Sequence, residues 1–172
     1  MSITAEDGTG VAGAESYVTV AYADAYFAAR AHLTASTTWG AADTDNKEGA
    51  LREATDYVDS VYGPFYRGQR AGYVQGLQWP RTNALSDDGY ALPDLPTELQ
   101  KAVCELAVRA LSSPLSSDAA RGGRVKRNKV EGAVEQEFFE GAPTETKYGV
   151  IAGMLNSILD GLQNNNPQWL WR

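Results

Sequence analysis

The chain has one cysteine and one histidine among its 172 residues. With Cys104 alone no intrachain disulfide can form, which favours a reducing compartment. His32 would have to serve any Ser–His–Asp arrangement, yet it ends a predicted helix, where a cationic side chain suits the helix dipole, so we predict a surface residue. One His and one Cys are too few ligands for a His/Cys zinc site. We expect no enzyme, no cofactor and no metal.

Long hydrophobic runs are also missing. No stretch approaches the roughly 20 apolar residues that a membrane span needs, and the N-terminus lacks the basic and apolar regions of a signal peptide. We therefore expect no membrane partner and a chain made in the cytoplasm. Asp87-Asp88-Gly89 lacks the ligand spacing of a calcium loop, so it predicts a turn.

Excess positive charge is absent as well. The formal net charge is −7 and the sequence pI is near 4.7, which argues against a general nucleic-acid binder. The hydrophobic content of 43% is enough for a core, and the length fits one domain with extended arms.

Hydrophobic periodicity predicts a mainly α protein, a small bundle of about four helices. We expect helices over residues 20–31, from Asp45 to about Val61, from Thr97 to about Leu111, and over 147–162. Thr19 is a predicted N-cap, and the pairs Asp45–Glu48 and Thr97–Gln100 have capping-box spacing. Gly63-Pro64 should end the second helix.

The remaining chain predicts the connections. Residues 5–14 predict a turn or a flexible arm, and residues 33–42 predict a linker rich in small side chains. Partial alternation around 124–139 predicts a strand or hairpin. The expected organisation is a helical domain over 1–163 and a C-terminal arm over 164–172.

A long irregular segment, residues 65–95, separates the second and third predicted helices. It is too apolar and aromatic for a flexible linker, and long ordered loops in small domains are often functional. We expect it to become ordered against its own domain or a neighbouring subunit. The candidate inter-subunit residues are Tyr73, Leu77, Trp79 and Arg81.

Five basic residues lie within nine positions of this acidic chain: Arg121, Arg124, Lys126, Arg127 and Lys129. They predict either a basic finger that contacts DNA phosphates or an acidic partner, or two solvated strand edges protected by charge. Aromatic residues do not interleave with them, so a base-stacking platform is not supported here.

The C-terminus carries Trp169, Leu170, Trp171 and Arg172 after an Asn-rich stretch. Trp and Arg are enriched among interface anchors. We favour docking of this arm on another subunit over packing on its own domain.

Several motifs together resemble a family of head-to-tail connectors of tailed phages, some members of which are labelled DnaT-like single-stranded DNA-binding proteins. They cover roughly the first two thirds of the chain, and 129–139 and the last predicted helix match more loosely. The motifs lie at Glu6–Gly10, Ser16–Thr19, Ala23–Arg30, Lys47–Asp59, Tyr66–Arg70, Gln75–Arg81, Asp88-Gly89 and Pro96–Ala107.

The resemblance implies a structural adaptor of the virion neck without enzymatic activity. It implies a ring of about twelve copies beneath the portal protein, extending the channel for double-stranded DNA and supporting the tail or a second connector protein. Position and composition suggest that Trp169–Arg172 contacts the portal or a neighbour. The alternative is a DnaT-like single-stranded DNA-binding protein.

Overall fold

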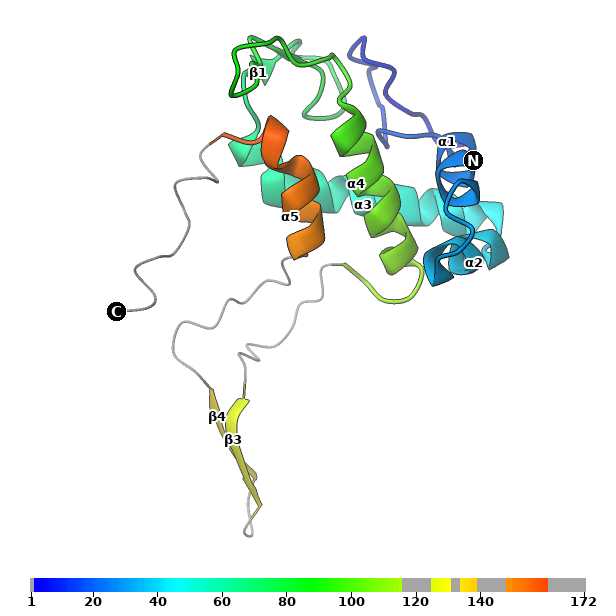
Figure 1. Cartoon of the computed structure of the whole chain (residues 1–172), viewed down its shortest axis with the longest axis vertical. Coiled ribbons are helices and arrows are strands. Elements are labelled where there is room, and N and C mark those ends of the chain that lie inside the picture. Colours follow the sequence, from blue (N-terminus) through cyan, green and yellow to red (C-terminus); the bar gives the residue numbers. More distant parts are fainter. Residues whose placement is uncertain (1, 116–124, 131–133, 139–147, 161–172) are drawn as a thin grey trace. The chain divides into compact units, whose positions relative to one another are not determined.

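The computed structural model describes residues 2–115, 125–130, 134–138 and 148–160 (Figure 1). The chain divides into a larger unit, residues 1–115 with 149–172, and a smaller one, residues 116–148. The α-helices are α1 Val20–Ala28, α2 Thr34–Ala41, α3 Thr44–Tyr62, α4 Thr97–Ala110 and α5 Gly149–Leu155, and the short 3-10 helices are η1 Gly63–Phe65 and η2 Asn156–Ile158. The strands are β1 Gln69–Arg70, β2 Arg81–Thr82, β3 Val125–Val130 and β4 Val134–Phe138. The predicted mainly α class is confirmed.

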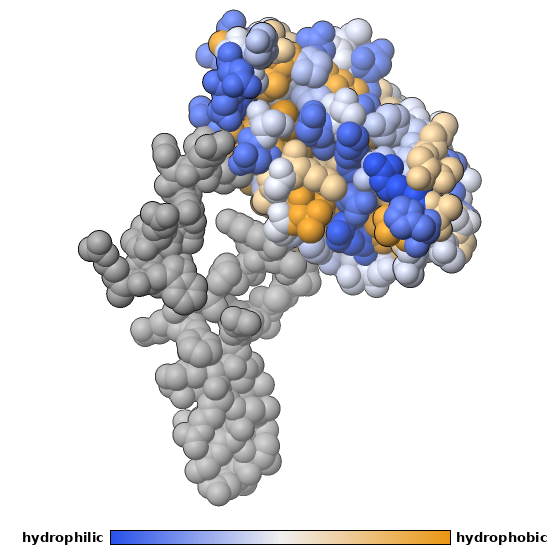
Figure 2. All heavy atoms as spheres, in the orientation of Figure 1, coloured by the Kyte–Doolittle hydropathy of each residue, from blue (hydrophilic) through white to orange (hydrophobic). Residues whose placement is uncertain are grey.

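The core of the larger unit lies where α4 packs against α3 and α5. The stripe predicted for the helix beginning at Thr97 is buried, and its Leu99 and Leu106 are fully inaccessible to solvent. Leu51 on α3 and Ile151 on α5 are also fully inaccessible. Burying one such side chain stabilises the fold by about 1.5–3 kcal/mol. On the face drawn in Figure 2, hydrophobic residues reach the surface in small groups among polar ones.

Helix α2 corrects the prediction of a linker over residues 33–42. Its sequence is poor in strong helix formers, and it is held by tertiary contacts of Trp39. The indole stacks on Phe27 with ring centroids 5.2 Å apart, and its Nε1 donates to Asp24 Oδ1 at 2.8 Å. Packing therefore overrides weak local propensity.

The helix N-termini match the predicted caps only in part. Thr19 is confirmed, because its hydroxyl accepts from the N–H of Tyr22. The Asp45–Glu48 capping box is wrong, since Asp43 caps α3 by accepting from Asn46 N at 2.8 Å. The Thr97–Gln100 box is also wrong, because Pro96 holds the N-cap position without a side-chain bond.

Two predicted helices are shorter than expected. The first ends at Ala28 rather than residue 31. The last comprises α5, from Gly149 to Leu155, and a tighter turn, η2, in place of a helix over 147–162. The predicted end of α3 before Gly63-Pro64 is confirmed.

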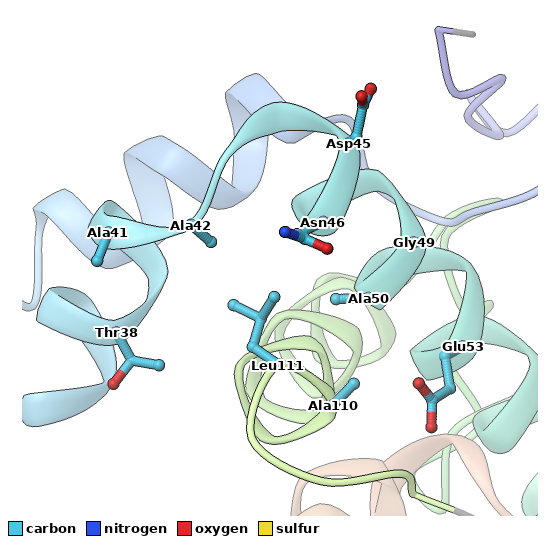
Figure 3. A pocket seen from close by; sticks show the side chains of 10 residues that line it. All are labelled: Thr38, Ala41, Ala42, Asp45, Asn46, Gly49, Ala50, Glu53, Ala110 and Leu111. Carbon is cyan, nitrogen blue, oxygen red and sulfur yellow. The ribbon is translucent and has the colours of Figure 1, made fainter.

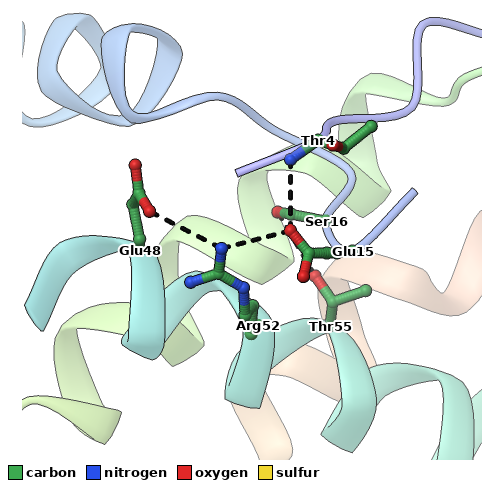
Figure 4. A network of polar contacts seen from close by, with 6 residues as sticks. All are labelled: Thr4, Glu15, Ser16, Glu48, Arg52 and Thr55. Carbon is green, nitrogen blue, oxygen red and sulfur yellow. Dashed lines mark hydrogen bonds and ion pairs between the residues drawn. The ribbon is translucent and has the colours of Figure 1, made fainter. Parts of the chain in front are cut away.

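The N-terminal segment is tied to α3 by charged and polar contacts (Figure 4). Arg52 on α3 approaches Glu15 at 3.1 Å and Glu48 at 3.5 Å, and a Glu15 carboxylate oxygen accepts from Thr4 N at 3.3 Å. The Thr55 hydroxyl, buried beside them, donates to Ser16 Oγ at 3.4 Å. The first residues are thus fixed against the helix rather than forming a flexible arm.

Two antiparallel strand pairs complete the described structure. β1 pairs with β2 in the larger unit, and β3 pairs with β4 in the smaller one, where a strand or hairpin was predicted. Among the described helices, none combines the length and apolar character of a membrane span.

Candidate interaction surface

The 65–95 segment is anchored to the core by Tyr17 and Asp59. The Tyr17 hydroxyl donates to Asp59 Oδ1 at 2.7 Å and accepts from the N–H groups of Gln78 at 3.0 Å and Trp79 at 3.2 Å. Gln78 N also donates to Asp59 Oδ2 at 3.0 Å. Two residues from distant parts of the chain therefore satisfy the backbone of the segment, as buried N–H groups require.

Burial sets the ionisation of this pair. It raises the pKa of Asp59 to about 6, although the hydrogen bonds from Tyr17 and Gln78 act in the opposite direction. Burial, and then the negative charge of Asp59, raise the pKa of Tyr17 well above its ordinary value. Tyr17 therefore remains a neutral donor near neutral pH, and Asp59 is the group that changes charge in the acid range.

Arg81 holds the segment together from within. Its Nε donates to Arg67 O at 2.7 Å and its Nη2 donates to Gly68 O at 2.7 Å, with a longer bond to Tyr66 O at 3.3 Å. Burial lowers the pKa of its guanidinium. The five donors of an arginine suit such a cluster of carbonyls, so the charge of Arg81 is directed into its own domain.

Gln75 shapes the turn that precedes Leu77. Its buried amide donates from Nε2 to Leu77 O at 2.9 Å and to Pro80 O at 3.1 Å, and its Oε1 accepts from Gly72 N at 2.7 Å. The turn it supports projects Tyr73, 98% exposed, and Val74, 73% exposed. A fixed backbone thus presents an aromatic and an aliphatic side chain to solvent.

The N-terminal loop, residues 6–11, packs against this turn. The buried Glu6 carboxylate accepts from the N–H groups of Gly8 at 3.0 Å, Gly10 at 2.9 Å and Val11 at 2.9 Å. Val11 O in turn accepts from Gly76 N at 3.2 Å. The predicted turn over residues 5–14 is therefore an ordered loop built around one carboxylate.

A second exposed group follows on the same segment. Leu85 and Tyr90, 50% and 75% exposed, flank the turn at Asp88-Gly89, where Gly89 adopts a φ of +82° as predicted for such a turn. Arg67 ties this turn to the fold, with hydrogen bonds to Leu85 O at 2.9 Å and to Leu159 O at 3.0 Å and an ion pair with Asp87. We call Tyr73, Val74, Leu85 and Tyr90 the exposed loop residues.

The charge of the segment is balanced. Residues 65–95 contain three arginines and three aspartates and no lysine or glutamate. Arg67 and Arg81 are bonded to backbone carbonyls within the domain. A balanced surface with exposed apolar side chains suits a protein partner better than a phosphate backbone.

The candidate inter-subunit residues are separated by the fold. Tyr73 is exposed as expected, but Leu77 and Trp79 are 8% and 0% exposed and pack within the domain. Of the two alternatives for the segment, these buried residues become ordered against their own domain. Sequence reasoning missed Val74, Leu85 and Tyr90 as further exposed residues, and for the last two the Asp88-Gly89 turn signal was the available clue.

The predicted basic finger and C-terminal docking residues lie only partly within the residues that the structure describes. Lys126, Arg127 and Lys129 lie on β3, whose register pairs Arg127 with Glu137 and Lys129 with Glu135. Both interpretations of the basic run, a basic finger and a charged strand edge, stay predictions. The remaining candidates lie outside the described residues: Arg121, Arg124, Trp169, Leu170, Trp171 and Arg172.

The single histidine and the single cysteine have ordinary surroundings. His32 is exposed. Cys104 is buried, and burial raises the pKa of its thiol to about 12, which suits a packing role rather than a nucleophile. Within the described ranges, no three His, Cys, Asp or Glu side chains gather as a metal site would require.

Comparison with known proteins gives one match. A family model described as "Putative DnaT-like ssDNA binding protein" matches residues 1–171. No curated protein and no solved structure matches the chain.

Proposed function

The chain belongs to the family described as "Putative DnaT-like ssDNA binding protein". From its motif resemblance to phage connectors, we propose that it is a structural head-to-tail adaptor of a tailed phage. In this proposal it forms a ring of about twelve copies under the portal protein, extends the channel for double-stranded DNA and carries the tail or a second connector protein. It acts without catalysis, in the neck of the virion, after synthesis in the host cytoplasm.

The exposed loop residues carry this proposal. Tyr73 and Val74 are held outward by a backbone fixed through Gln75, and Tyr90 lies on a turn tied down by Arg67. Large apolar side chains on a preorganised loop lose little freedom on binding, which favours docking on another protein. A ring subunit needs such surfaces because each copy contacts two neighbours through different faces.

Charge supports the same proposal. A net charge of −7 gives DNA in a channel no strong overall attraction, and the 65–95 segment adds no net positive charge. A conduit should let DNA pass, whereas a binding protein should neutralise phosphates.

The deciding experiment measures the mass of the purified protein alone and mixed with the portal protein of the same virus, followed by electron microscopy of any complex. A ring on the portal is the expected result. A protein whose mass is unaffected by portal would contradict the adaptor proposal.

The family description supports a second candidate, single-stranded DNA binding. Tyr73 and Tyr90 are exposed aromatic rings of the kind on which bases stack, and Arg70 lies in the same segment. Fluorescence anisotropy with a labelled oligonucleotide at two salt concentrations tests it. Tight binding that weakens steeply with salt, together with indifference to portal, would favour this candidate.

A further inference from the structure

A groove of about 490 Å³ opens between α2, the N-terminal half of α3 and the C-terminal end of α4 (Figure 3). Small side chains make most of its walls, and its lining includes Ala42, Asn46, Gly49, Ala50, Glu53 and Leu111. The groove lies away from the exposed loop residues, none of which lines it. It is therefore a separate surface of the larger unit.

The chemistry of the groove suits a flat aromatic side chain with a hydrogen-bond donor. Ala50 and Leu111 point into the space from α3 and α4, and Asn46 points into it beside them (Figure 3). Asn46 Nδ2 is bonded to Asp43 Oδ2 at 3.0 Å, so the amide oxygen is the group left for a ligand. An indole combines apolar area with an N–H that seeks an acceptor when buried.

We propose that this groove receives the C-terminal segment Trp169–Arg172 of a second copy of the chain. The segment offers two indoles, a leucine and a guanidinium. Asp45 and Glu53 lie at the edge of the groove; the Asp45 carboxylate points outward from it (Figure 3), and Glu53 Oε1 accepts from Leu115 N at 2.6 Å. Arginine pairs well with carboxylates, so the charges are complementary.

The position at which the described chain ends favours a second copy over the same chain. Asp160 N donates to Phe65 O at 2.6 Å, just beyond the C-terminal end of α3, whereas the groove is lined by the N-terminal half of that helix. At 1.5 Å per residue, Gly49 lies about 20 Å from Tyr62 along the axis. The nine residues from Asp160 to Trp169 span at most about 30 Å. The segment would have to extend to about two thirds of its full reach, beyond the r.m.s. span of about 16 Å of a flexible chain of nine residues, to arrive at its own groove.

This inference rests on the proposed self-association into a ring, and it names the contact between neighbouring copies. It does not need the arm to contact the portal. A ring closed by such arms links each copy to the next through two different surfaces, as a head-to-tail interface requires.

Crosslinking between two full-length single variants tests the contact. One variant carries Gly49→Cys in the groove and the other carries Leu170→Cys, which leaves both tryptophans and Arg172 in place. A short bismaleimide is added to the mixture, alone and with portal protein. The native Cys104 is buried and its thiol pKa is raised to about 12, so it contributes little background. The matched control replaces Gly49→Cys with Gly40→Cys, an exposed helical position outside the groove.

We expect a crosslinked dimer of G49C with L170C, several-fold more abundant than with G40C. The double variant G49C/L170C is treated with the same reagent as a further sample. A crosslink found only within its monomers would place the arm in its own groove and overturn the proposal. Absence of any crosslink, with and without portal, would also overturn it. Portal binding is scored separately by mass, so a crosslinked ring that ignores portal would contradict the adaptor function and leave this contact standing.

A steric variant gives an independent readout. A Cβ added at Gly49 or at Gly40 would meet no atom within 4 Å, so the first side-chain atom of Gly49→Phe and of Gly40→Phe has room, and urea denaturation checks that both variants fold. Gly49→Phe should fill the groove and reduce self-association, measured by sedimentation velocity of the full chain with portal. Gly40→Phe should assemble normally. Equal assembly of the two variants would show that the groove is not occupied.

Discussion

The hydroxyl of Tyr17 lies 2.7 Å from the carboxylate of Asp59, and the same hydroxyl accepts from the N–H groups of Gln78 and Trp79. A residue three positions before α1, the C-terminal half of α3 and the centre of the 65–95 segment therefore meet at one oxygen atom. Leu77 immediately precedes this junction and its carbonyl accepts from Gln75, so the turn that presents Tyr73 and Val74 is continuous with it.

Removing this hydroxyl should weaken the whole larger unit. Tyr17→Phe leaves the two backbone donors and Asp59 without one partner each, and an unsatisfied buried group costs about 1–3 kcal/mol. We expect a lower free energy of unfolding by that amount in urea denaturation followed by circular dichroism. Tyr22→Phe, at a less buried tyrosine, is the control. Equal stability of the two variants would contradict the role assigned to Tyr17.

The ionisation of Asp59 should make stability depend on pH. Its pKa is about 6 in the folded chain against 3.8 when unperturbed. The folded state therefore binds this proton more tightly, so its contribution is fully present below about pH 3.8 and is lost as pH rises through about 6. The shift corresponds to about 3 kcal/mol.

Asp59→Asn isolates that contribution, because other carboxylates titrate in both proteins. The free energy of unfolding of the wild type minus that of Asp59→Asn should fall between pH 4 and pH 7, by up to about 3 kcal/mol. Urea denaturation at several pH values measures it. A difference that stays constant over this range would show that the carboxylate is not perturbed by burial.

The exposed loop residues should matter for assembly and not for folding. The double variant Y73S/V74S changes side chains that are 98% and 73% exposed, so its stability should remain within about 0.5 kcal/mol of the wild type. Association with neighbouring copies or portal should weaken by about tenfold or more, as expected for loss of an aromatic anchor.

Val150→Ser supplies the matched control for this variant. Val150 is 59% exposed and lies on α5 rather than on the loop segment. Sedimentation velocity with portal should detect normal assembly for Val150→Ser and reduced assembly for Y73S/V74S. Normal assembly of Y73S/V74S would show that Tyr73 and Val74 are not part of the interface.

The close approach of two loops at Gly76 should not tolerate a side chain. A Cβ at this position would lie 2.7 Å from Ala14 N and 2.8 Å from Ala14 O, both backbone atoms. Gly76→Ala should reduce the free energy of unfolding by about 1–3 kcal/mol. Thermal denaturation should detect this as a lower melting temperature. Gly72→Ala in the same turn meets its nearest atom at 3.9 Å and should be neutral. Loss of stability in both variants alike would point to a cause other than this contact.

Local pattern predicted the parts of the fold that local forces determine. The amphipathic stripe of α4 and the stop at Gly63-Pro64 follow from side-chain spacing and from proline chemistry. Helix α2 could not be predicted because its stability comes from Trp39 packing on Phe27, twelve positions earlier. The cap at Pro96 escaped prediction because Thr97 offers the better local signal.

The candidate surface was predicted in outline and missed in detail. The length and aromatic content of residues 65–95 predicted a functional segment. Which of its side chains are buried and which are exposed depends on contacts with residues far away in the sequence. Trp79 is buried where the hydroxyl of Tyr17, 62 positions away, accepts from its backbone N–H. The predicted interface residues therefore divide, with Tyr73 outside and Leu77 and Trp79 inside.

The shared hydrogen bonds at Tyr17 also bear on the kinetics of the loop. The amide hydrogens of Gln78 and Trp79 are bonded to groups anchored before α1 and on α3, so they should exchange with deuterium only when that core opens. A loop that opens so rarely reaches its partner already in the binding conformation. In the proposed ring, the association rate of a subunit should then be set by diffusional encounter and orientation, with no separate step that orders the loop.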